Sequence, residues 1–379
     1  GTYVIQASIR DYSDFSQIIQ TVPDDNYFEV EGREVWGATV TEGPDGLYYM
    51  IFSTWHNTQG FSNDWAVYSE LGYAVSTSPD GPFVYQGLAL DANYTNTTNT
   101  EPVYWEGVGT LEVFHNPTLM HSEKDGKYYL YFMGTNATEG GYTYAYGRNH
   151  QRIGVAVADT PAGPWTVYDK PVIDVREGMF DSLLTSNPSV TEVKNPDGTY
   201  TYYTVYKGVS SPTGKPLDGN DIVVSGCGYS DSPFGPFTRS EEAIMQNPTD
   251  GWSVEDCFLW SSNGKFYALA KDFKNYFTGV TGYPYSYALF ESSDGMTDWA
   301  VSDNALAFVT EIPWESGTQT VSHLERAQIY LEDGVPFLLC CATTKDGQSP
   351  YNGHAPYNVQ IPLLGVVLAE DSESLTVTG

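Results

Sequence analysis

Basic residues are scarce in this chain. Its 379 residues include 17 Lys and Arg against 48 Asp and Glu, which gives a formal net charge of −31 at pH 7. A field of this sign repels nucleic acid and anionic membranes, so we expect neither as a partner. The charge suits a neutral small molecule or a glycan, whereas an anionic ligand would require the few cations to gather in one place.

Cysteines and long apolar runs are also scarce. The four cysteines form no CxxC pair and no Cys/His spacing typical of structural zinc. Cys340 and Cys341 stand in the apolar run FLLCCAT, which predicts two buried thiols. Because there is no run of about 18 apolar residues, we expect no membrane-spanning helix. The first residue is Gly1, from which we expect a mature or trimmed chain.

Aromatic residues and glycines are abundant, and hairpin-like segments recur. Each segment joins a strand, a tight turn and an aromatic-rich strand, as in NPTLMHSEKDGKYYLYF. Their starts are about 70–80 residues apart. The segments span 37–52, 116–132, 187–206, 256–270 and 326–340.

A second motif, Ser/Thr-Pro-x-Gly-Pro-aromatic, follows the first three hairpins. It reads STSPDGPF at 76–83, ADTPAGPW at 158–165 and SDSPFGPF at 230–237. Proline fixes φ and glycine permits positive φ, so the motif predicts a turn between a third and a fourth strand, with the aromatic ring packed back on the sheet. We expect these turns to be structural.

Repeated units of four strands predict an all-β fold, a five-bladed β-propeller of four-stranded antiparallel blades. A linear solenoid would need atypical capping repeats, which the sequence lacks. We expect a single domain over 1–379, and an N-terminal strand such as TYVIQAS to close the ring. The expected blades cover approximately 33–92, 112–174, 183–244, 252–308 and 321–370.

The expected propeller places its functional groups on one rim. In a four-stranded meander, the start of strand A and the loop between strands B and C lie on the same rim. The expected B–C loops are long and rich in Tyr, Trp, Asn, Gly and His. Such loops on a rigid scaffold commonly bind ligands, and aromatic rings beside amides and hydroxyls suit sugars.

Polar residues recur at the starts of the A strands, in VWGAT, FHNPT, TSNPS, VEDCF and LERAQ. We expect their side chains to face the central channel or the pocket. The central positions are Gly37, Asn116, Asn187, Asp256 and Arg326, preceded by Trp36, His115, Ser186, Glu255 and Glu325.

These motifs resemble those of five-bladed propeller glycoside hydrolases, the furanosidase-type groups around families 43, 62, 32, 68 and 117. The resemblance rests on NPTLM…DGKYYLYFMGT, RIGVAVADTPAGPW, the Asn-Pro start at 187 and VEDCFLW. It implies an Asp at the start of strand A in two blades and a Glu in a third, as base or nucleophile, pKa tuner and acid. This chain departs from that pattern, because Asn116 and Asn187 stand where Asp-Pro is expected and Gly37 stands in blade 1.

Carboxylates gather instead in the blades that flank the ring closure. Hydrolysis needs one protonated and one ionised carboxyl group across the glycosidic bond, so we expect Asp256 and Glu325 to be the catalytic pair and Glu34 the alternate acid. The alternative is that Glu255 and Glu325 form structural ion pairs around the channel. The expected substrate-binding residues are Trp36, His56, His115, Asn116, Asn187, Lys207, Glu255, Lys271 and Arg326.

We therefore expect a secreted or periplasmic glycosidase that releases a terminal sugar, and among such enzymes an exo-acting and inverting one. It would require no cofactor, although the resemblance leaves open a structural calcium ion in the channel near His115. Three alternatives stay open: a phosphorylase that binds phosphate through Lys207, Lys271 and Arg326, a uronate-specific lyase, and a non-catalytic glycan-binding propeller.

Overall fold

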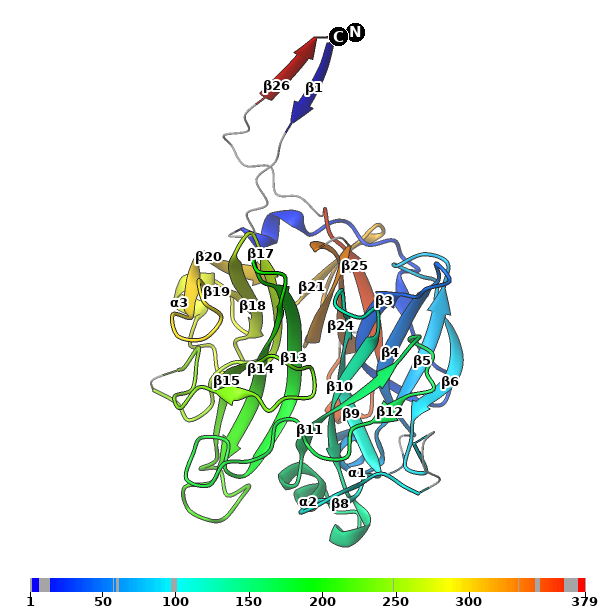
Figure 1. Cartoon of the computed structure of the whole chain (residues 1–379), viewed down its shortest axis with the longest axis vertical. Coiled ribbons are helices and arrows are strands. Elements are labelled where there is room, and N and C mark those ends of the chain that lie inside the picture. The colour runs from blue at the N-terminus through cyan, green and yellow to red at the C-terminus, as the bar shows by residue number, and fades with distance from the viewer. Residues whose placement is uncertain are drawn as a thin grey trace.

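Five small antiparallel sheets stand in a ring in the computed structural model of the chain (Figure 1). The expected five-bladed β-propeller is therefore confirmed. The structure describes residues 2–6, 14–364 and 374–378, apart from 57, 59–60, 97–100, 248, 333 and 345–347.

Four of the five blades take their strands in chain order, and each runs as a meander from the channel outward. Blade 1 contains β3 (Glu34–Glu42), β4 (Tyr48–Trp55), β5 (Glu70–Ser76) and β6 (Val84–Leu90). Blade 2 contains β9 (Val113–His121), β10 (Tyr128–Thr135), β11 (Arg152–Ala158) and β12 (Thr166–Val167). Blade 3 contains β13 (Leu184–Lys194), β14 (Tyr200–Ser210), β15 (Ile222–Ser230) and β16 (Thr238–Arg239). Blade 4 contains β17 (Glu255–Ser262), β18 (Lys265–Lys271), β19 (Tyr287–Ser292) and β20 (Ala300–Phe308).

The fifth blade closes the ring with a strand from earlier in the chain. It contains β23 (Glu325–Glu332), β24 (Val335–Thr344), β25 (Pro356–Pro362) and, at its outer edge, β2 (Tyr27–Phe28). The expectation that TYVIQAS supplies this strand was wrong, since β1 (Thr2–Gln6) pairs instead with β26 (Ser374–Thr378). β2 suits the position because it leads directly into blade 1 and buries Phe28 against Phe52. Residues 365–370 of the expected fifth blade lie outside the described residues.

The repeated proline turns are structural elements, as expected. Each contains a cis peptide bond between its glycine and the second proline, at Gly81–Pro82, Gly163–Pro164 and Gly235–Pro236. The aromatic residue that closes each turn is buried: Phe83, Trp165 and Phe237.

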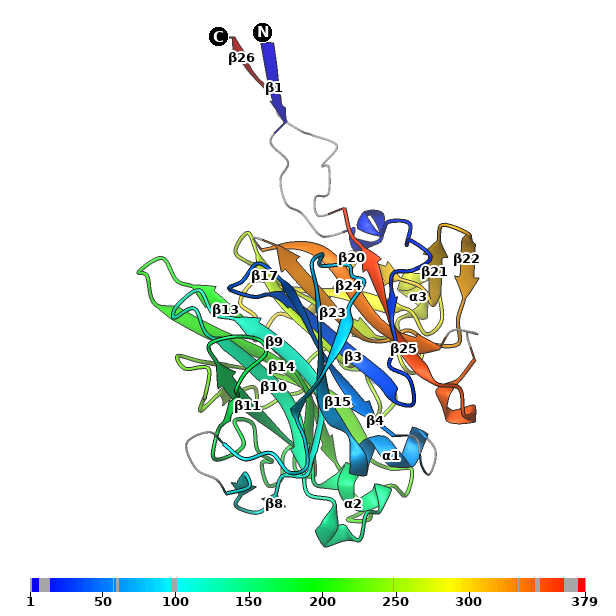
Figure 2. The same cartoon turned by 90° about the vertical axis from the view of Figure 1, so that its right-hand side faces the viewer.

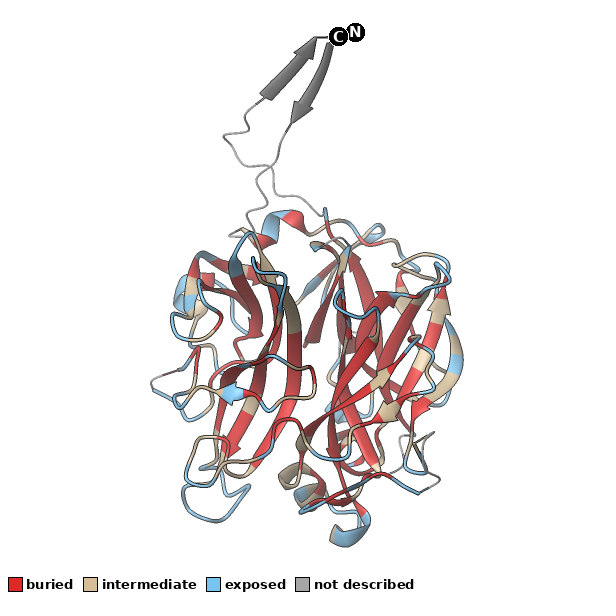
Figure 3. Cartoon of the chain, viewed as in Figure 1, coloured by how far each residue is buried: buried red, intermediate tan, exposed pale blue. Residues whose placement is uncertain are grey.

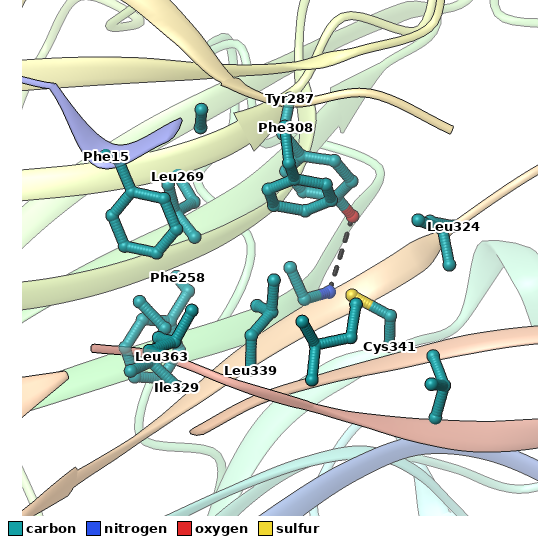
Figure 4. Packing of buried hydrophobic residues seen from close by; sticks show 14 of the residues in the cluster. Phe15, Phe258, Leu269, Tyr287, Phe308, Leu324, Ile329, Leu339, Cys341 and Leu363 are labelled. Atoms are coloured by element: carbon teal, nitrogen blue, oxygen red, sulfur yellow. Dashed lines mark hydrogen bonds between the residues drawn. The ribbon is translucent and has the colours of Figure 1, made fainter. Parts of the chain in front are cut away.

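Apolar side chains fill the spaces between neighbouring blades, so the strands are mostly buried and the loops are exposed (Figure 3). The largest cluster joins blades 4 and 5 (Figure 4). Phe15 of the short helix η1 (Phe15–Ile18) packs there against Trp260, so the chain before β2 also contributes to this seam. Cys340 and Cys341 are buried free thiols, which confirms the prediction from FLLCCAT.

Short helices mark the rim that carries the B–C loops. Helices α1 and α2 come from neighbouring blades and contact one another at the same end of the propeller (Figures 1 and 2). No helix among the described residues is long and apolar enough to cross a membrane. The helices in these loops are α1 (Phe61–Tyr68), η2 (Thr138–Gly140), α2 (Tyr144–Asn149), α3 (Thr278–Thr281) and η3 (Pro350–Asn352).

Candidate active site at the mouth of the propeller channel

The five innermost strands begin with the same backbone irregularity. In every blade, the pairing of strand A with strand B shifts in register near its start. The residue at the expected central position adopts positive φ in all five, which aims its side chain differently from a regular strand residue. The φ values are 55° at Gly37, 50° at Asn116, 50° at Asn187, 53° at Asp256 and 52° at Arg326.

Side chains at these positions form a continuous hydrogen-bonded arc. Asn116 Nδ2 donates to Asn187 Oδ1 at 2.8 Å, and Asn187 Nδ2 donates to Asp256 Oδ1 at 2.8 Å. The backbone amide of Arg326 donates to Asp256 Oδ2 at 3.2 Å. Both oxygens of Asp256 are therefore held by neighbouring blades, and the carboxylate has little freedom to move.

Gly37 leaves room for the Arg326 side chain. A Cβ atom at Gly37 would lie 3.3 Å from both Cβ and Cγ of Arg326. Arg326 is fully buried, with its Nη1 atom 3.6 Å from Asp256 Oδ1 and its Nη2 atom donating to the backbone oxygen of Asn116 at 3.4 Å. Because blade 1 has glycine at this position, the Arg326 side chain has room to reach across the arc.

Arg326 also affects whether the channel could hold the calcium ion that the resemblance leaves open. A buried guanidinium at the channel mouth repels a second cation, and the nearest carboxylate, that of Asp256, already forms an ion pair with it. The described residues also contain no group of three or more His, Cys, Asp and Glu side chains placed to hold a metal ion. The channel residues therefore do not suit calcium.

A cavity of about 340 Å³ opens beside this arc. Its floor comes from the strand starts, and its walls come from the B–C loops and the chain leading into blade 4. The lining side chains combine aromatic rings with both signs of charge. They belong to Trp36, Phe61, Trp65, His115, Asn116, Tyr144, Arg148, Gln151, Leu184, Ser186, Asn187, Lys207, Leu217, Asp221, Val223, Trp252, Glu255, Asp256, Phe273, Glu325 and Tyr351, and Gly219 contributes backbone.

Two glutamates flank Asp256 in the cavity, and each pairs with a lysine at the end of a strand B. Lys207 Nζ lies 3.1 Å from Glu255 Oε1, and Lys271 Nζ lies 2.5 Å from Glu325 Oε1. Lys271 is almost fully buried, whereas Lys207 retains about a fifth of its side-chain exposure. The two ion pairs therefore differ in the distance between the charged groups and in the burial of the lysine.

His115 forms part of the cavity wall and is neutral. Its pKa lies well below the ordinary value, because burial disfavours the charged ring and because Arg326 and Lys207 are nearby. Its Nδ1 atom lies 2.8 Å from Ser69 Oγ, and the ring stacks on Trp65. The residue therefore fixes the indole of Trp65 at the cavity wall.

Several residues expected at the site lie outside the cavity wall. Glu34 is buried at the start of β3, where its backbone oxygen accepts a hydrogen bond from Thr54. His56 contacts Arg33 through Nε2 and the backbone oxygen of Gly32 through Nδ1. Lys271 and Arg326 reach the site only through their carboxylate partners.

Some cavity residues were not anticipated. Arg148 of α2 donates to Asp221 at 2.8 Å, which joins the B–C loops of blades 2 and 3 across the site. Trp252 stacks on Phe273 with ring centroids 4.8 Å apart. The aromatic richness of these loops was a signal, but loop sequences do not show which rings turn inward.

The sequence also did not predict a role near the site for His323, which precedes Glu325 by two residues. Its ring stacks on Trp36, with centroids 6.0 Å apart. Burial, with a smaller effect from Lys271, lowers its pKa to about 4. His323 is therefore a neutral support behind the cavity wall.

Comparisons with known proteins give distant matches. No protein-family profile matches the chain. A xylosidase/arabinosidase of Bacteroides ovatus is 24% identical over 251 residues, which cover 64% of this chain and 65% of that protein. An extracellular endo-α-(1→5)-L-arabinanase of Bacillus subtilis is 24% identical over 233 residues, covering 53% of this chain and 46% of its own length. The chain thus matches less than two thirds of the length of each.

Solved structures match over nearly the whole chain. A family 117 glycoside hydrolase of the marine bacterium Zobellia galactanivorans superposes with a TM-score of 0.59 at 16% identity, covering 98% of this chain and 92% of its own. A thermostable family 43 glycoside hydrolase gives 0.57 at 15% identity, covering 93% and 98%. The expected resemblance to propellers of these two families is confirmed at the level of fold.

Proposed function

We propose that this protein is a glycoside hydrolase that cleaves sugars from an oligosaccharide or polysaccharide. The observation that carries the proposal is one cavity that places Glu255, Asp256 and Glu325, from two neighbouring blades, beside an aromatic wall. Carboxyl pairs supply the acid and base for glycosidic cleavage, and aromatic faces stack on sugar rings. The matched xylosidase/arabinosidase and arabinanase favour a pentose-containing plant polysaccharide as the substrate.

We assign the two reactive roles to the glutamates. Glu255 is assigned as the general acid, because its partner Lys207 lies 3.1 Å away and is about a fifth exposed, so this cation restrains the carboxyl group less. Glu325 is assigned as the base, because Lys271, at 2.5 Å and almost fully buried, gives it a close cationic partner.

We assign Asp256 a positioning role in place of the catalytic one expected from the sequence. Both of its oxygens already accept hydrogen bonds, and Arg326 balances its charge. A carboxylate held in this way cannot turn toward a substrate without breaking the arc. It is a positioning residue that fixes the backbone between Glu255 and the start of β23.

The same proposal includes release of terminal sugars, inversion at the anomeric centre and action outside the cytoplasm. The helices of the B–C loops wall one end of the cavity, which supports release of terminal sugars rather than cleavage within a chain. Inversion of the anomeric centre is the expected outcome, and proton NMR of the first product formed would report it. The extracellular arabinanase among the relatives supports action outside the cytoplasm.

Phosphorolysis is less compatible with this geometry. Lys207, Lys271 and Arg326 each face a carboxylate, so their charges are already balanced. A phosphate would have to displace these partners. The site therefore favours water over phosphate as the attacking species.

The test compares Glu255→Gln and Glu325→Gln with the wild type. The substrates are 4-nitrophenyl and 2,4-dinitrophenyl α-L-arabinofuranosides and β-D-xylosides, together with linear arabinan. Loss of either group should lower kcat on arabinan about 10²–10⁴-fold. Glu255→Gln should recover on the dinitrophenyl substrates, because a good leaving group needs no acid, whereas Glu325→Gln should not.

The matched control is Glu123→Gln, which removes an exposed glutamate that pairs with Lys194 at 2.6 Å. It should behave as the wild type. If both cavity variants also retain wild-type turnover while the wild type cleaves the substrate, the reactive carboxylates lie elsewhere. If the wild type cleaves none of these glycosides, the proposed pentosidase activity is wrong.

A further inference from the structure

A second cleft, of about 530 Å³, lies at the outer edge of blade 5. It shares no lining residue with the catalytic cavity. Its wall combines three aromatic side chains with three polar ones. These are Tyr27, Trp314 and Tyr357, with Asp24, Ser316 and Gln319.

One side of the cleft is a hairpin outside the blades, formed by β21 (Glu311–Trp314) and β22 (Gly317–Thr320). Figure 2 shows this hairpin at the edge of the propeller, beside β25. The backbone of Val22 fixes its position, by donating to Pro313 at 2.8 Å and accepting from Glu315 at 2.9 Å. The Trp314 indole donates to Gln319 Oε1 at 2.9 Å, so its ring has a defined orientation.

The other side of the cleft belongs to blade 5 itself. Tyr27 of β2 and Tyr357 of β25 meet edge to face, with ring centroids 5.5 Å apart. Burial, with smaller effects from Tyr27 and Glu29, raises the pKa of Tyr357, so its hydroxyl stays neutral. At the rim, Asp24 Oδ1 accepts hydrogen bonds from the amide and the hydroxyl of Ser316, at 3.1 and 2.8 Å.

We propose that this cleft is a second glycan-binding site, which holds a neutral stretch of polysaccharide apart from the point of cleavage. Two partly exposed aromatic rings, those of Tyr27 and Trp314, beside an amide, hydroxyls and a carboxylate form the arrangement that recognises a sugar. Asp24 and the formal charge of −31 disfavour uronate or sulfate groups, so the bound glycan is neutral. The proposal takes its class of ligand from the proposed function.

The fold connects this cleft with the catalytic cavity. Tyr357 stands near the start of β25, and the loop directly before that strand carries Tyr351 of the cavity wall. Both sites therefore draw on the same rim of blade 5. A polysaccharide bound at the cleft raises the local concentration of chain ends at the cavity.

The experiment measures binding and turnover separately. Wild type, Trp314→Ala and Gln319→Ala are run in native gels that contain soluble linear arabinan or neutral arabinoxylan. The control is Tyr104→Ala, which removes an exposed aromatic ring (63% exposed) that lines neither site. Hydrolysis of 4-nitrophenyl glycosides is measured for all four proteins, and thermal melting confirms that each is folded.

We expect Trp314→Ala to weaken retardation by at least one polysaccharide about tenfold, through loss of a stacking face. Gln319→Ala should weaken it less, and Tyr104→Ala should have no effect. Turnover of the small glycosides should be the same in all four.

Equal retardation of wild type and Trp314→Ala, or no retardation of the wild type by either polymer, would overturn the proposal. Retardation that depends on Trp314 without any hydrolysis would support this site while rejecting the proposed enzyme. The two proposals therefore fail separately.

Discussion

At the scale of single residues, the site depends on how each charged or polar group is balanced. Glu255 and Glu325 would be equivalent by sequence, since both precede the central position of a strand A. Their lysine partners make them unequal, because Lys271 lies closer to its glutamate and is more deeply buried than Lys207. The proposed acid and base roles rest on that difference between the two lysines rather than on residue type.

His323 gives a prediction for the dependence of stability on pH. Its pKa is about 4 in the folded protein and close to 6.5 in the unfolded chain, so only the unfolded chain takes up its proton between these values. The contribution of His323 is complete above pH 6.5 and is lost as the pH falls toward 4. The free energy of unfolding should decline by about 1.4 kcal/mol per pH unit in this window on its account.

Urea unfolding of wild type and His323→Asn at several pH values from 4 to 7 would measure this contribution. The variant should show a shallower slope, even if it is less stable at every pH because its ring no longer stacks on Trp36. His115, whose pKa is also lowered, leaves part of the slope in both proteins. Two parallel curves would show that His323 is not held neutral.

At the scale of elements, the five strand starts repeat one backbone geometry and differ in what they carry. Positive φ recurs at all five, but only blade 1 places glycine there. The reason is packing as well as backbone conformation, since a Cβ atom at residue 37 would make a tight contact of 3.3 Å with the Arg326 side chain. The glycine of one blade and the arginine of its neighbour thus form one structural unit.

Gly37→Ala tests this unit. The substitution should lower the free energy of unfolding by about 2–4 kcal/mol, because the positive φ and the contact with Arg326 both oppose a Cβ atom. Gly46→Ala is the matched control, since its φ is 74° but no atom lies within 4 Å of an added Cβ. It should cost only about 1–2 kcal/mol, from backbone conformation alone.

Denaturant melts of both alanine variants provide the measurement. Equal losses in the two variants would mean that Arg326 does not press on Gly37. That result would remove the packing argument for glycine in blade 1.

At the scale of the whole molecule, the ring is closed by a strand from before blade 1 and its mouth is held together by a buried cation. β2 joins the first and last blades, and Arg326 contacts groups from blades 2 and 4. The ring is therefore held closed by strand pairing at its outer edge and by the contacts of Arg326 at its centre.

We predict that calcium does not stabilise this propeller. A ligand raises the melting temperature only if it binds the folded state preferentially, and Arg326 disfavours a cation at the channel mouth. The melting temperature should therefore be the same in EDTA and in millimolar CaCl₂. Magnesium at equal ionic strength controls for general screening of the charge of −31. A rise that is specific to calcium and reversed by EDTA would contradict the prediction.

The sequence by itself determined the propeller, the number of blades and the rim that carries the site. Hairpins and proline turns are local signals, since a turn and its two strands lie within about twenty residues. Their regular spacing also aligns the starts of the A strands. This alignment shows that Asn116, Asn187, Asp256 and Arg326 occupy equivalent positions in their blades.

Only the tertiary structure decided which of these groups line the cavity and which hold one another in place. In the structure, Glu34 and His56 lie outside the cavity wall, and both oxygens of Asp256 accept hydrogen bonds. Asp221 and aromatic residues of the loops line the cavity. It also assigned ring closure to β2 instead of β1. These outcomes depend on contacts between residues far apart in the chain, and burial, ion pairing and loop conformation are not encoded in local periodicity.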